Sequence, residues 1–320
     1  MTKNRIEHTT SKYGIREEAK RFPMMIVLSF IYTCNARCPN CPYNNSDIRS
    51  AYHDAMIMPD EIFKRIADES GAYNSLLRLS GGGEPMLHPN AVELMLYAKK
   101  KGCKIGLITN GSKFNKENLE ILIKNEIDAI EFSVDADCKE TYSYVRPGLD
   151  WDLLNKNVRY SIELRNRLKS NTKIICSIIN QNKVDVENAE KYWNKIVDKV
   201  QVRKYLTWGI NDDFSADDSP YLPPEERVPC PWLFERLNID SRGDVTLCGE
   251  DIAFNEKFAN IMEHSIADIW KGDTFTSFRK KHLEKQGDEI PICSKCPDWQ
   301  YRSWGYNYWK VLKDAEGHKR

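Results

Sequence analysis

The sequence predicts an α/β fold in which a partial (βα)6 barrel, open on one side, is followed by a small C-terminal domain. Three observations favour this fold. Between residues 25 and 198, short apolar segments alternate with helical ones, which is the pattern of a parallel sheet built through right-handed crossovers. Glycine-rich or polar turns follow several of the strands, at the end where such sheets bind ligands. After residue 210 the composition changes, and a second group of cysteines follows.

The expected strands are short apolar runs, each ended by a turn signal or a polar residue. They are Met25–Phe30, Ser75–Ser80, Lys104–Thr109, Ala129–Val134 and Lys173–Ile179. We count the last of these as the sixth strand. Arg203, Tyr205 and Trp208 then follow the last barrel strand, where they could face a substrate or simply belong to an amphipathic segment at a domain junction.

The expected helices follow the strands. They are Pro59–Ala72, Pro89–Lys101, Asn115–Asn125, Trp151–Leu168 and Val184–Asp198. The first has an early proline and acidic residues in its first turn, which suits a helix amino terminus. The second is closed by Gly102, as helices often are.

The C-terminal part begins after a linker. Residues 211–220 are polar and acidic, and Pro223-Pro224 follows them. Beyond the linker we expect a hairpin over Asn238–Cys248 with Gly243 at its turn, and helices over Ser265–Trp270 and Thr274–Lys285. The predicted domains are an N-terminal extension (1–22), the barrel (23–210) and the C-terminal domain (211–320).

The composition limits the classes of partner. The 47 basic and 47 acidic residues cancel, so there is no electrostatic case for nucleic acid or membrane-surface binding. The longest apolar run, residues 24–32, is far shorter than the roughly 20 residues that span a bilayer, and the N-terminus has no apolar secretory signal. We therefore expect a cytoplasmic protein with a small molecule or a peptide as partner. In such a protein, ten cysteines indicate metal ligation rather than disulfides.

Three cysteines, Cys34, Cys38 and Cys41, fall within eight residues directly after the first strand. Three thiolates can hold one metal centre and leave it one ligand short, and an open position is where chemistry can occur. The alternatives for these residues are a zinc knuckle and plain buried thiols.

The spacing CxxxCxxC of this triplet resembles that of the radical S-adenosylmethionine (radical SAM) enzymes, whose barrels are TIM-like and partial. The resemblance implies that Cys34, Cys38 and Cys41 hold a 4Fe-4S cluster whose open iron is chelated by S-adenosylmethionine. It also implies that the reduced cluster cleaves this cofactor to a 5′-deoxyadenosyl radical, which takes a hydrogen atom from an unactivated carbon. A low-potential donor such as flavodoxin or ferredoxin would then be a further partner.

Other motifs extend this resemblance. Gly81-Gly82-Gly83-Glu84-Pro85 matches the family's GGE motif, which contacts the methionine end of the cofactor, and Thr109-Asn110-Gly111 resembles its TNG element. Strand alternation is expected to place Ser133 and Asp135 on one face. The cofactor contacts implied by the resemblance are Gly82, Gly83, Glu84, Asn110, Ser133, Arg146 and Asn180, with Arg146 pairing with the cofactor carboxylate. For Ser133, Asp135 and Asn180 the alternative is a polar strand-end cap.

One position departs from the family pattern. Many members carry an aromatic residue just before the third cysteine, where it packs on adenine, and this chain has Asn40 there. We expect backbone contacts from Asn40 to persist and Tyr43 to supply the stacking ring.

A second cysteine group, Cys230, Cys248, Cys293 and Cys296, resembles the C-terminal extension of the SPASM and twitch subfamilies. No cysteine follows Cys296, so the resemblance implies a truncated, twitch-type domain with one auxiliary 4Fe-4S cluster; the rival is a four-cysteine zinc site. Four thiolates would close the auxiliary cluster and suit it to accept an electron. The aromatic segment from Trp299 to Trp309 is expected to pack over this cluster or the open side of the barrel.

The reaction expected from this architecture is oxidation of a small alcohol, such as a sugar or cyclitol, because the chain resembles the radical SAM dehydrogenase of an aminocyclitol. An epimerase is an alternative, and it would need a cysteine as hydrogen donor. Cys138 is the candidate, because Cys103 lies before a strand and Cys176 lies inside one. Asp135, at the same rim, is the other catalytic candidate. A peptide maturase is a further alternative, although such enzymes often carry an N-terminal recognition domain. A non-catalytic metal-binding protein is the alternative from another class.

Overall fold

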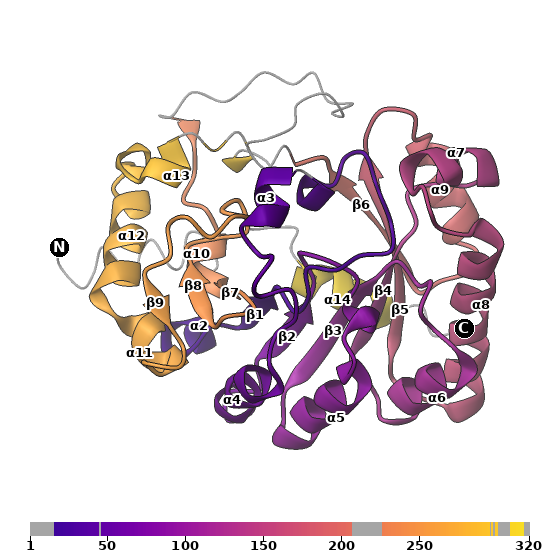
Figure 1. Cartoon of the computed structure of the whole chain (residues 1–320), viewed down its shortest axis with the longest axis horizontal. Coiled ribbons are helices and arrows are strands. Elements are labelled where there is room, and N and C mark those ends of the chain that lie inside the picture. Colours follow the sequence, from indigo (N-terminus) through magenta and orange to yellow (C-terminus); the bar gives the residue numbers. More distant parts are fainter. Residues whose placement is uncertain are drawn as a thin grey trace.

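The computed structural model describes residues 16–44, 46–206, 226–294, 296, 298–299 and 308–316. Within these residues nine strands form one sheet in the order β6-β5-β4-β3-β2-β1-β7-β8-β9 (Figure 1). Strands β1 to β6 are parallel to their neighbours, and β7 continues the sheet parallel to β1. This topology confirms the predicted partial barrel. The predicted boundary at residues 210 and 211 lies outside the described residues.

The barrel strands are β1 (Met25–Leu28), β2 (Leu76–Leu79), β3 (Lys104–Thr109), β4 (Ala129–Ser133), β5 (Lys173–Asn180) and β6 (Lys199–Lys204). The count in the sequence analysis was wrong, because Lys173–Asn180 is the fifth strand. The sixth strand, β6, begins six residues after the preceding helix, which ends at Trp193 rather than at Asp198. Arg203 lies within β6 and does not follow it.

Helices cover the outer face of the sheet (Figure 1). The predicted ones are α4 (Asp60–Gly71), α5 (Ala91–Lys101), α6 (Lys116–Lys124), α8 (Trp151–Leu168) and α9 (Val186–Trp193). The elements not predicted here are α2 (Glu17–Arg21), η1 (Pro42–Asn44), α3 (Ser46–Ser50), η2 (Pro85–Leu87) and α7 (Lys139–Val145). Local signals fix several helix ends: Gly102 ends α5 at a φ of +98°, and the Asp150 carboxylate caps α8.

Strand alternation divides the barrel residues between two faces. Leu77, Leu79 and Ile105 are among those that pack outward into the hydrophobic core beneath the helices. Arg78 and Glu131 face inward and line a cavity. The polar residues inside the apolar strands therefore belong to the inner face, where the site lies.

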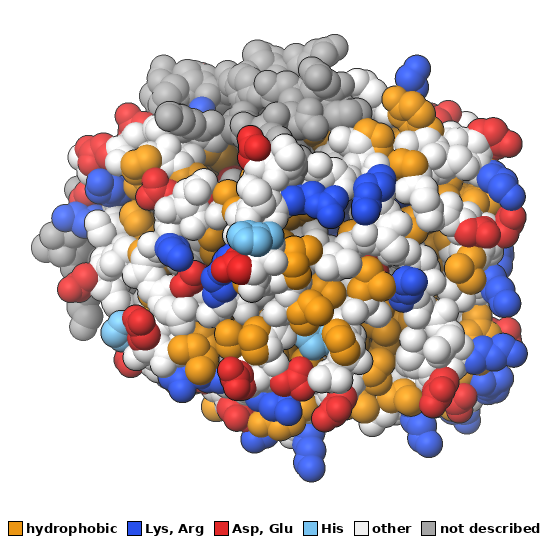
Figure 2. All heavy atoms as spheres, in the orientation of Figure 1, with side chains coloured by type: hydrophobic (Ala, Val, Ile, Leu, Met, Phe, Trp, Pro, Cys, Tyr) orange, Lys and Arg blue, Asp and Glu red, His pale blue; other side chains and the backbone are white. Residues whose placement is uncertain are grey.

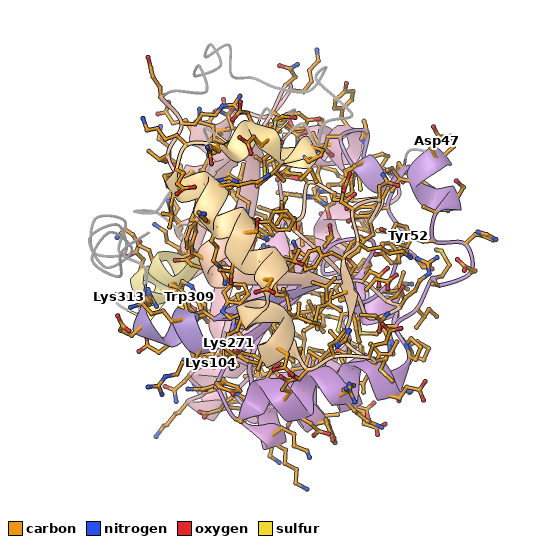
Figure 3. The ribbon with its side chains drawn as sticks, turned by 90° about the vertical axis from the view of Figure 1, so that its left-hand side faces the viewer. Asp47, Tyr52, Lys104, Lys271, Trp309 and Lys313 are labelled. Atoms are coloured by element: carbon orange, nitrogen blue, oxygen red, sulfur yellow. The ribbon has the colours of Figure 1, made fainter. Side chains whose placement is uncertain are left out.

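A C-terminal helix, α14 (Tyr308–Glu316), lies against the inner face near the amino ends of the strands (Figure 1). Tyr308 packs against Met25 and Leu76, the first residues of β1 and β2. Figure 3 places Trp309 on the opposite side of the molecule from Tyr52, which follows the cysteine loop. Part of the predicted aromatic segment thus closes the floor of the barrel; residues 300–307 lie outside the described residues.

The C-terminal part extends the sheet sideways. Its elements are α10 (Trp232–Glu235), β7 (Arg236–Ile239), β8 (Asp244–Thr246), β9 (Ala259–Asn260), α11 (Ile266–Lys271), α12 (Asp273–Leu283), η4 (Gly287–Glu289) and α13 (Pro291–Ser294). The β7–β8 hairpin and its turn at Gly243, with a φ of +82°, confirm the sequence prediction. Charges of both signs are interspersed on the visible face (Figure 2). Among the described helices, none is both long and apolar enough to cross a membrane.

Candidate active site

A cavity of about 370 Å³ opens at the carboxyl ends of the barrel strands, on the inner face of the sheet. Its wall combines the cysteine loop, the glycine turn after β2, strand ends and part of β7. The sequence-predicted residues that line it are Cys34, Cys38, Cys41, Asn40, Tyr43, Gly82, Gly83, Glu84, Asn110, Ser133 and Arg146. Asp135, Cys138 and Asn180 are not among the described residues that line the cavity.

The three cysteines of the loop share this cavity, and N–H groups point at two of their sulfurs. The Ala36 amide donates to Cys34 Sγ at 3.4 Å, and Arg146 Nη1 lies 3.8 Å from Cys38 Sγ. Burial raises the pKa of the Cys41 thiol to about 12, so this thiol stays protonated at neutral pH unless a metal replaces the proton. Three thiols with donors directed at sulfur fit a cluster held by three thiolates, because such donors stabilise charge on the sulfurs.

The glycine turn is pressed against the cysteine loop. Ile31 forms a parallel bridge with Gly82, and Glu84 N donates to Thr33 O at 2.9 Å. A Cβ on Gly82 would lie 2.5 Å from Ile31 O, and one on Gly83 would lie 2.2 Å from Thr33 O. Real Cβ atoms do not approach backbone so closely, so only glycine allows the turn to hold the loop in this position.

Glu84 is 2% exposed, and its carboxylate accepts hydrogen bonds from other residues of the chain. Its two oxygens accept hydrogen bonds from Thr109 Oγ1 at 2.6 Å and from Asn110 N at 2.7 Å. Burial outweighs these bonds and raises the pKa of Glu84. Asn110 in turn donates to Asn35 Oδ1 at 3.0 Å, and its amide nitrogen lies 4.0 Å from Cys34 Sγ. Glu84 therefore ties the turn after β2 to the turn after β3.

Arg146 forms an ion pair with Asp135, a carboxylate that is 1% exposed. Asp135 also accepts a hydrogen bond from Ile179 N at 2.7 Å. Burial alone would lower the pKa of Arg146, but the Asp135 charge raises it above its usual value. Arg146 Nε is buried and makes no hydrogen bond within the described residues, so the guanidinium retains a donor at the cavity. That donor fits a cofactor carboxylate.

The predicted sharing of one face by Ser133 and Asp135 is wrong. Strand β4 ends at Ser133, and Asp135 has a left-handed φ of +47°, so the alternation of the strand does not extend to it. Ser133 lines the cavity, whereas Asp135 lies behind Arg146. The structure thus places Asp135 where it positions Arg146.

Tyr43 and Asn40 both line the cavity beside the cysteine loop. The Tyr43 ring is tilted against Tyr32 with 5.8 Å between centroids, and Tyr32 stacks on Tyr52 at 3.6 Å. Burial raises the pKa of Tyr43 above its usual value. An aromatic cluster therefore holds Tyr43 at the wall, where a flat ligand ring can contact it.

The remaining predicted residues lie outside this wall. Cys138 is the N-cap residue of α7, and its thiol donates to Thr141 Oγ1 at 3.4 Å. Asn180 ends β5. Cys103 and Cys176 are buried, and the Cys103 thiol donates to Ala67 O at 3.3 Å.

The four C-terminal cysteines form a second group. Cys293 interacts electrostatically with Cys230 and Cys296. Cys248 interacts in the same way with Cys230 and Cys293. Among the described side chains, no three His, Cys, Asp or Glu groups converge closely enough to share one metal ion. Four thiolates can hold either a zinc ion or an iron–sulfur cluster, because thiolate ligation does not itself select the metal.

His282 belongs to this second group, and the sequence analysis missed it. Its Nδ1 accepts the Cys230 amide at 3.2 Å, and its Nε2 lies 3.4 Å from Cys293 Sγ. Since Nδ1 accepts, Nε2 carries the proton and donates to sulfur. Burial lowers the pKa of His282 to about 4, so the ring is neutral. Trp299, the first residue of the predicted aromatic segment, packs on this ring with 4.5 Å between centroids.

Polar residues on the inner wall of the barrel were also missed. They are Arg78, Glu131, Ser177 and Asn238. The available signal was a single charged residue inside an apolar strand, as in LLRL of β2 and AIEFS of β4. Arg203 and Tyr205, which the sequence analysis named, line the same cavity, and Trp208 lies outside the described residues.

Comparison with known families gives two matches. Residues 28–192 match the model described as the radical SAM superfamily, and residues 230–297 match the SPASM model, described as an iron-sulfur cluster-binding domain.

Among curated proteins, this chain is similar to the tungsten-containing aldehyde ferredoxin oxidoreductase cofactor-modifying protein of Pyrococcus furiosus, with 24% identity over 85% of this chain and 86% of that protein. It is also similar to the PqqA peptide cyclase of Xanthomonas euvesicatoria pv. vesicatoria, with 23% identity over 87% and 82%.

Two solved structures share the fold. Streptococcus suis SuiB bound to precursor peptide SuiA has a TM-score of 0.66 at 16% identity and covers 86% of this chain and 69% of its own. BtrN in complex with AdoMet and 2-DOIA has a TM-score of 0.56 at 18% identity and covers 85% and 92%.

Proposed function

The chain belongs to the radical SAM superfamily, and from this premise we propose that it removes hydrogen from a C–H bond of its substrate and releases an oxidised product. Cys34, Cys38 and Cys41 would hold a 4Fe-4S cluster, and Arg146 would bind the carboxylate of S-adenosylmethionine. When bound, these groups would supply the radical chemistry that removes a hydrogen atom from carbon. The residues of the chain orient the cofactor and exclude water.

The observation that supports an oxidative outcome is the second group of cysteines. Cys230, Cys248, Cys293 and Cys296 offer four thiols, and His282 donates a hydrogen bond to one of them. Four thiolates would leave an auxiliary 4Fe-4S cluster without an open position, so it would supply electron acceptance rather than substrate binding. Dehydrogenation requires this, because after one hydrogen atom is lost the substrate must still lose one electron and one proton.

For the substrate we propose a small alcohol, as in a sugar or cyclitol. The same fold in BtrN, solved with AdoMet and 2-DOIA, supports it. A peptide is the second candidate, supported by the similarity over most of the chain to PqqA peptide cyclases and by the fold shared with SuiB bound to its precursor peptide. An epimerase has less support, because Cys138 does not line the cavity within the described residues.

Anaerobic reconstitution tests the cofactor content. Wild type should bind about eight irons, and the Cys34, Cys38 and Cys41 triple alanine variant about four. With dithionite and S-adenosylmethionine, only wild type should form 5′-deoxyadenosine. Cys103→Ala is the matched control and should keep both clusters, because Cys103 belongs to neither group. Zinc in place of iron, or no cofactor cleavage by fully loaded protein, would refute the proposal.

The auxiliary group has its own test. Cys296→Ala should still form 5′-deoxyadenosine but should release no two-electron oxidised product. We also propose that reduced flavodoxin or ferredoxin is the electron donor, so either protein should replace dithionite in this assay. The proposed location is the cytoplasm. If Cys296→Ala still oxidises the substrate fully, a group other than the auxiliary cluster accepts the electron that the substrate loses.

A further inference from the structure

The inner wall of the barrel carries a charged group beneath the cysteine loop. Arg78 on β2, Glu131 on β4 and Arg203 on β6 come from alternate strands of the sheet and line the same cavity. Arg203 Nη2 donates to Glu131 Oε1 at 2.7 Å, and Arg78 Nη2 lies 4.0 Å from Glu131 Oε2. Two guanidinium groups thus share one carboxylate.

The exposure of these side chains is uneven. The Glu131 side chain is 1% exposed, whereas that of Arg203 is 29% exposed. Burial by itself would raise the pKa of Glu131, but the charges of Arg203 and Arg78 outweigh it, and the pKa falls below its usual value. The carboxylate is therefore ionised and sealed in the wall, and the Arg203 guanidinium is presented to the cavity.

Arg203 offers unused donors at the cavity. Within the described residues its guanidinium makes a single hydrogen bond, to Glu131, so its other N–H groups are available to a ligand. A partly buried guanidinium with such donors is stabilised by an anionic ligand.

Asn238 provides a second, independent observation. This residue of β7 is 3% exposed and lines the cavity. Neither Asn238 Oδ1 nor Nδ2 has a hydrogen-bond partner within the described part of the chain. A buried amide without partners costs free energy, and such groups are rare in native proteins. A ligand at this wall can accept a hydrogen bond from Nδ2 through a carboxylate oxygen and donate one to Oδ1 through a hydroxyl group.

The floor beneath this group is closed. Arg78 lies over the Tyr308 ring of α14 at 5.2 Å, and Tyr308 packs on Met25 and Leu76. A ligand that reaches Arg203 therefore does not enter through the part of the floor that Tyr308 covers. A group held at the floor would leave the rest of the ligand directed at the cofactor site.

We propose that Arg203 and Asn238 form a subsite for a carboxylate of the substrate. This inference rests on the proposed function and names the substrate class. A carboxylate offers two acceptor oxygens in one plane, which match the paired donors of a guanidinium. The carboxylate can belong to a small hydroxy acid, such as a sugar acid, which also carries the proposed alcohol, or to an acidic side chain of a peptide.

Calorimetry on anaerobically reconstituted protein with S-adenosylmethionine tests the subsite. The probes are lactate against lactamide, and a capped tripeptide with a central glutamate against its glutamine counterpart. Wild type should bind at least one carboxylate about ten-fold or more tightly than its amide, as expected for charge-assisted hydrogen bonds. The pair that shows this preference identifies the source of the carboxylate.

Variants make the test specific. Arg203→Met and Asn238→Asp should each abolish the preference, and Arg203→Lys should restore part of it. Asn238→Asp keeps the size of the side chain and adds a repelling charge, so it remains informative if Arg203→Met fails to fold. Lys199→Met is the matched control on the same strand, because Lys199 does not line the cavity. The control should retain the preference.

Two results would overturn the proposed subsite. In the first, the wild-type protein binds neither carboxylate more tightly than the corresponding amide. In the second, Arg203→Met and Asn238→Asp both keep the preference for the carboxylate. Wild-type formation of 5′-deoxyadenosine is measured separately. Cofactor cleavage without carboxylate preference overturns this inference alone, and a preference without cleavage overturns the proposed function.

Discussion

At the scale of single residues, Asp135 illustrates how a carboxylate can act through a neighbour. It holds Arg146 while accepting the Ile179 amide, so removal of its charge should leave the guanidinium misplaced. We expect Asp135→Asn to weaken binding of S-adenosylmethionine by about ten-fold, as for loss of a charge-assisted contact, with an unchanged iron content. Equilibrium dialysis with the cofactor measures this. Asp137→Asn is the matched control, and equal affinity of both variants would contradict the role of Asp135.

His282 is a second residue whose effect is transmitted through a neighbour. Its Nε2–H donates to Cys293 Sγ and stabilises negative charge there. His282→Phe should therefore lower the reduction potential of the proposed auxiliary cluster by about 40 mV, the equivalent of one hydrogen bond of about 1 kcal/mol. Redox titration followed by electron paramagnetic resonance measures the shift. His264→Phe, at an exposed histidine, should leave the potential unchanged.

Asp240 gives a pH dependence. It is fully buried in the β7–β8 turn, where burial raises its pKa to about 6 even though Arg242 N and Asp244 N donate to it. The unfolded value is about 3.9, so this group stabilises the fold most below about pH 4, and that stability is lost as the pH rises through about 6. The change is about 3 kcal/mol.

Asp240→Asn should remove this pH-dependent contribution to the free energy of unfolding. Thermal unfolding of wild type and variant between pH 4.5 and 7.5 should therefore give midpoints whose difference changes with pH across that range. A difference that is constant with pH would show that Asp240 does not titrate there.

At the scale of elements, the glycine turn after β2 sets the position of the cysteine loop. Gly82→Ala would force a Cβ to within 2.5 Å of Ile31 O at a φ of +75°. We expect this variant to lose more than half of the iron of the first cluster. Gly102→Ala is the control, because Gly102 also has a positive φ but ends α5 away from the loop. Both variants should be less stable, but only Gly82→Ala should lose iron, as measured by iron analysis.

Elements with strong local signals were predictable from the sequence. Apolar runs predicted the strands β1 to β5. The helix Trp151–Leu168 was predicted with the same first and last residues that the structure has. Strand β6 was missed because KVQVRK alternates two valines with charged and polar residues that face a cavity or solvent. The cysteines could be found from their spacing. His282 and Asn238 could not, because their roles depend on partners brought together only by the fold; Cys230 is 52 positions from His282.

At the scale of the whole molecule, the C-terminal part and the barrel share one sheet and one core. Ser29 N donates to Ile239 O at 3.0 Å, and Trp270 Nε1 donates to Ala19 O at 2.6 Å. Leu28, Ile239 and Trp270 belong to the same buried cluster. Without the C-terminal part, β1 would become an exposed edge strand with uncovered apolar surface.

A fragment ending at residue 206 should therefore not fold independently. We expect it to lack a cooperative thermal transition by circular dichroism, whereas the full chain has one. A cooperative melt of the fragment within a few degrees of the full chain would show that the barrel is a separate folding unit.

The position of α14 has a consequence for biosynthesis. This helix closes the floor of the barrel but is translated after every strand that it covers. The strands must therefore emerge from the ribosome and pair while their inner face is still open to water. The charged residues Arg78 and Glu131 tolerate that exposure better than an apolar lining would. Closure of the cavity thus belongs to the last stage of synthesis, and iron loading that needs a closed floor must follow translation of the helix.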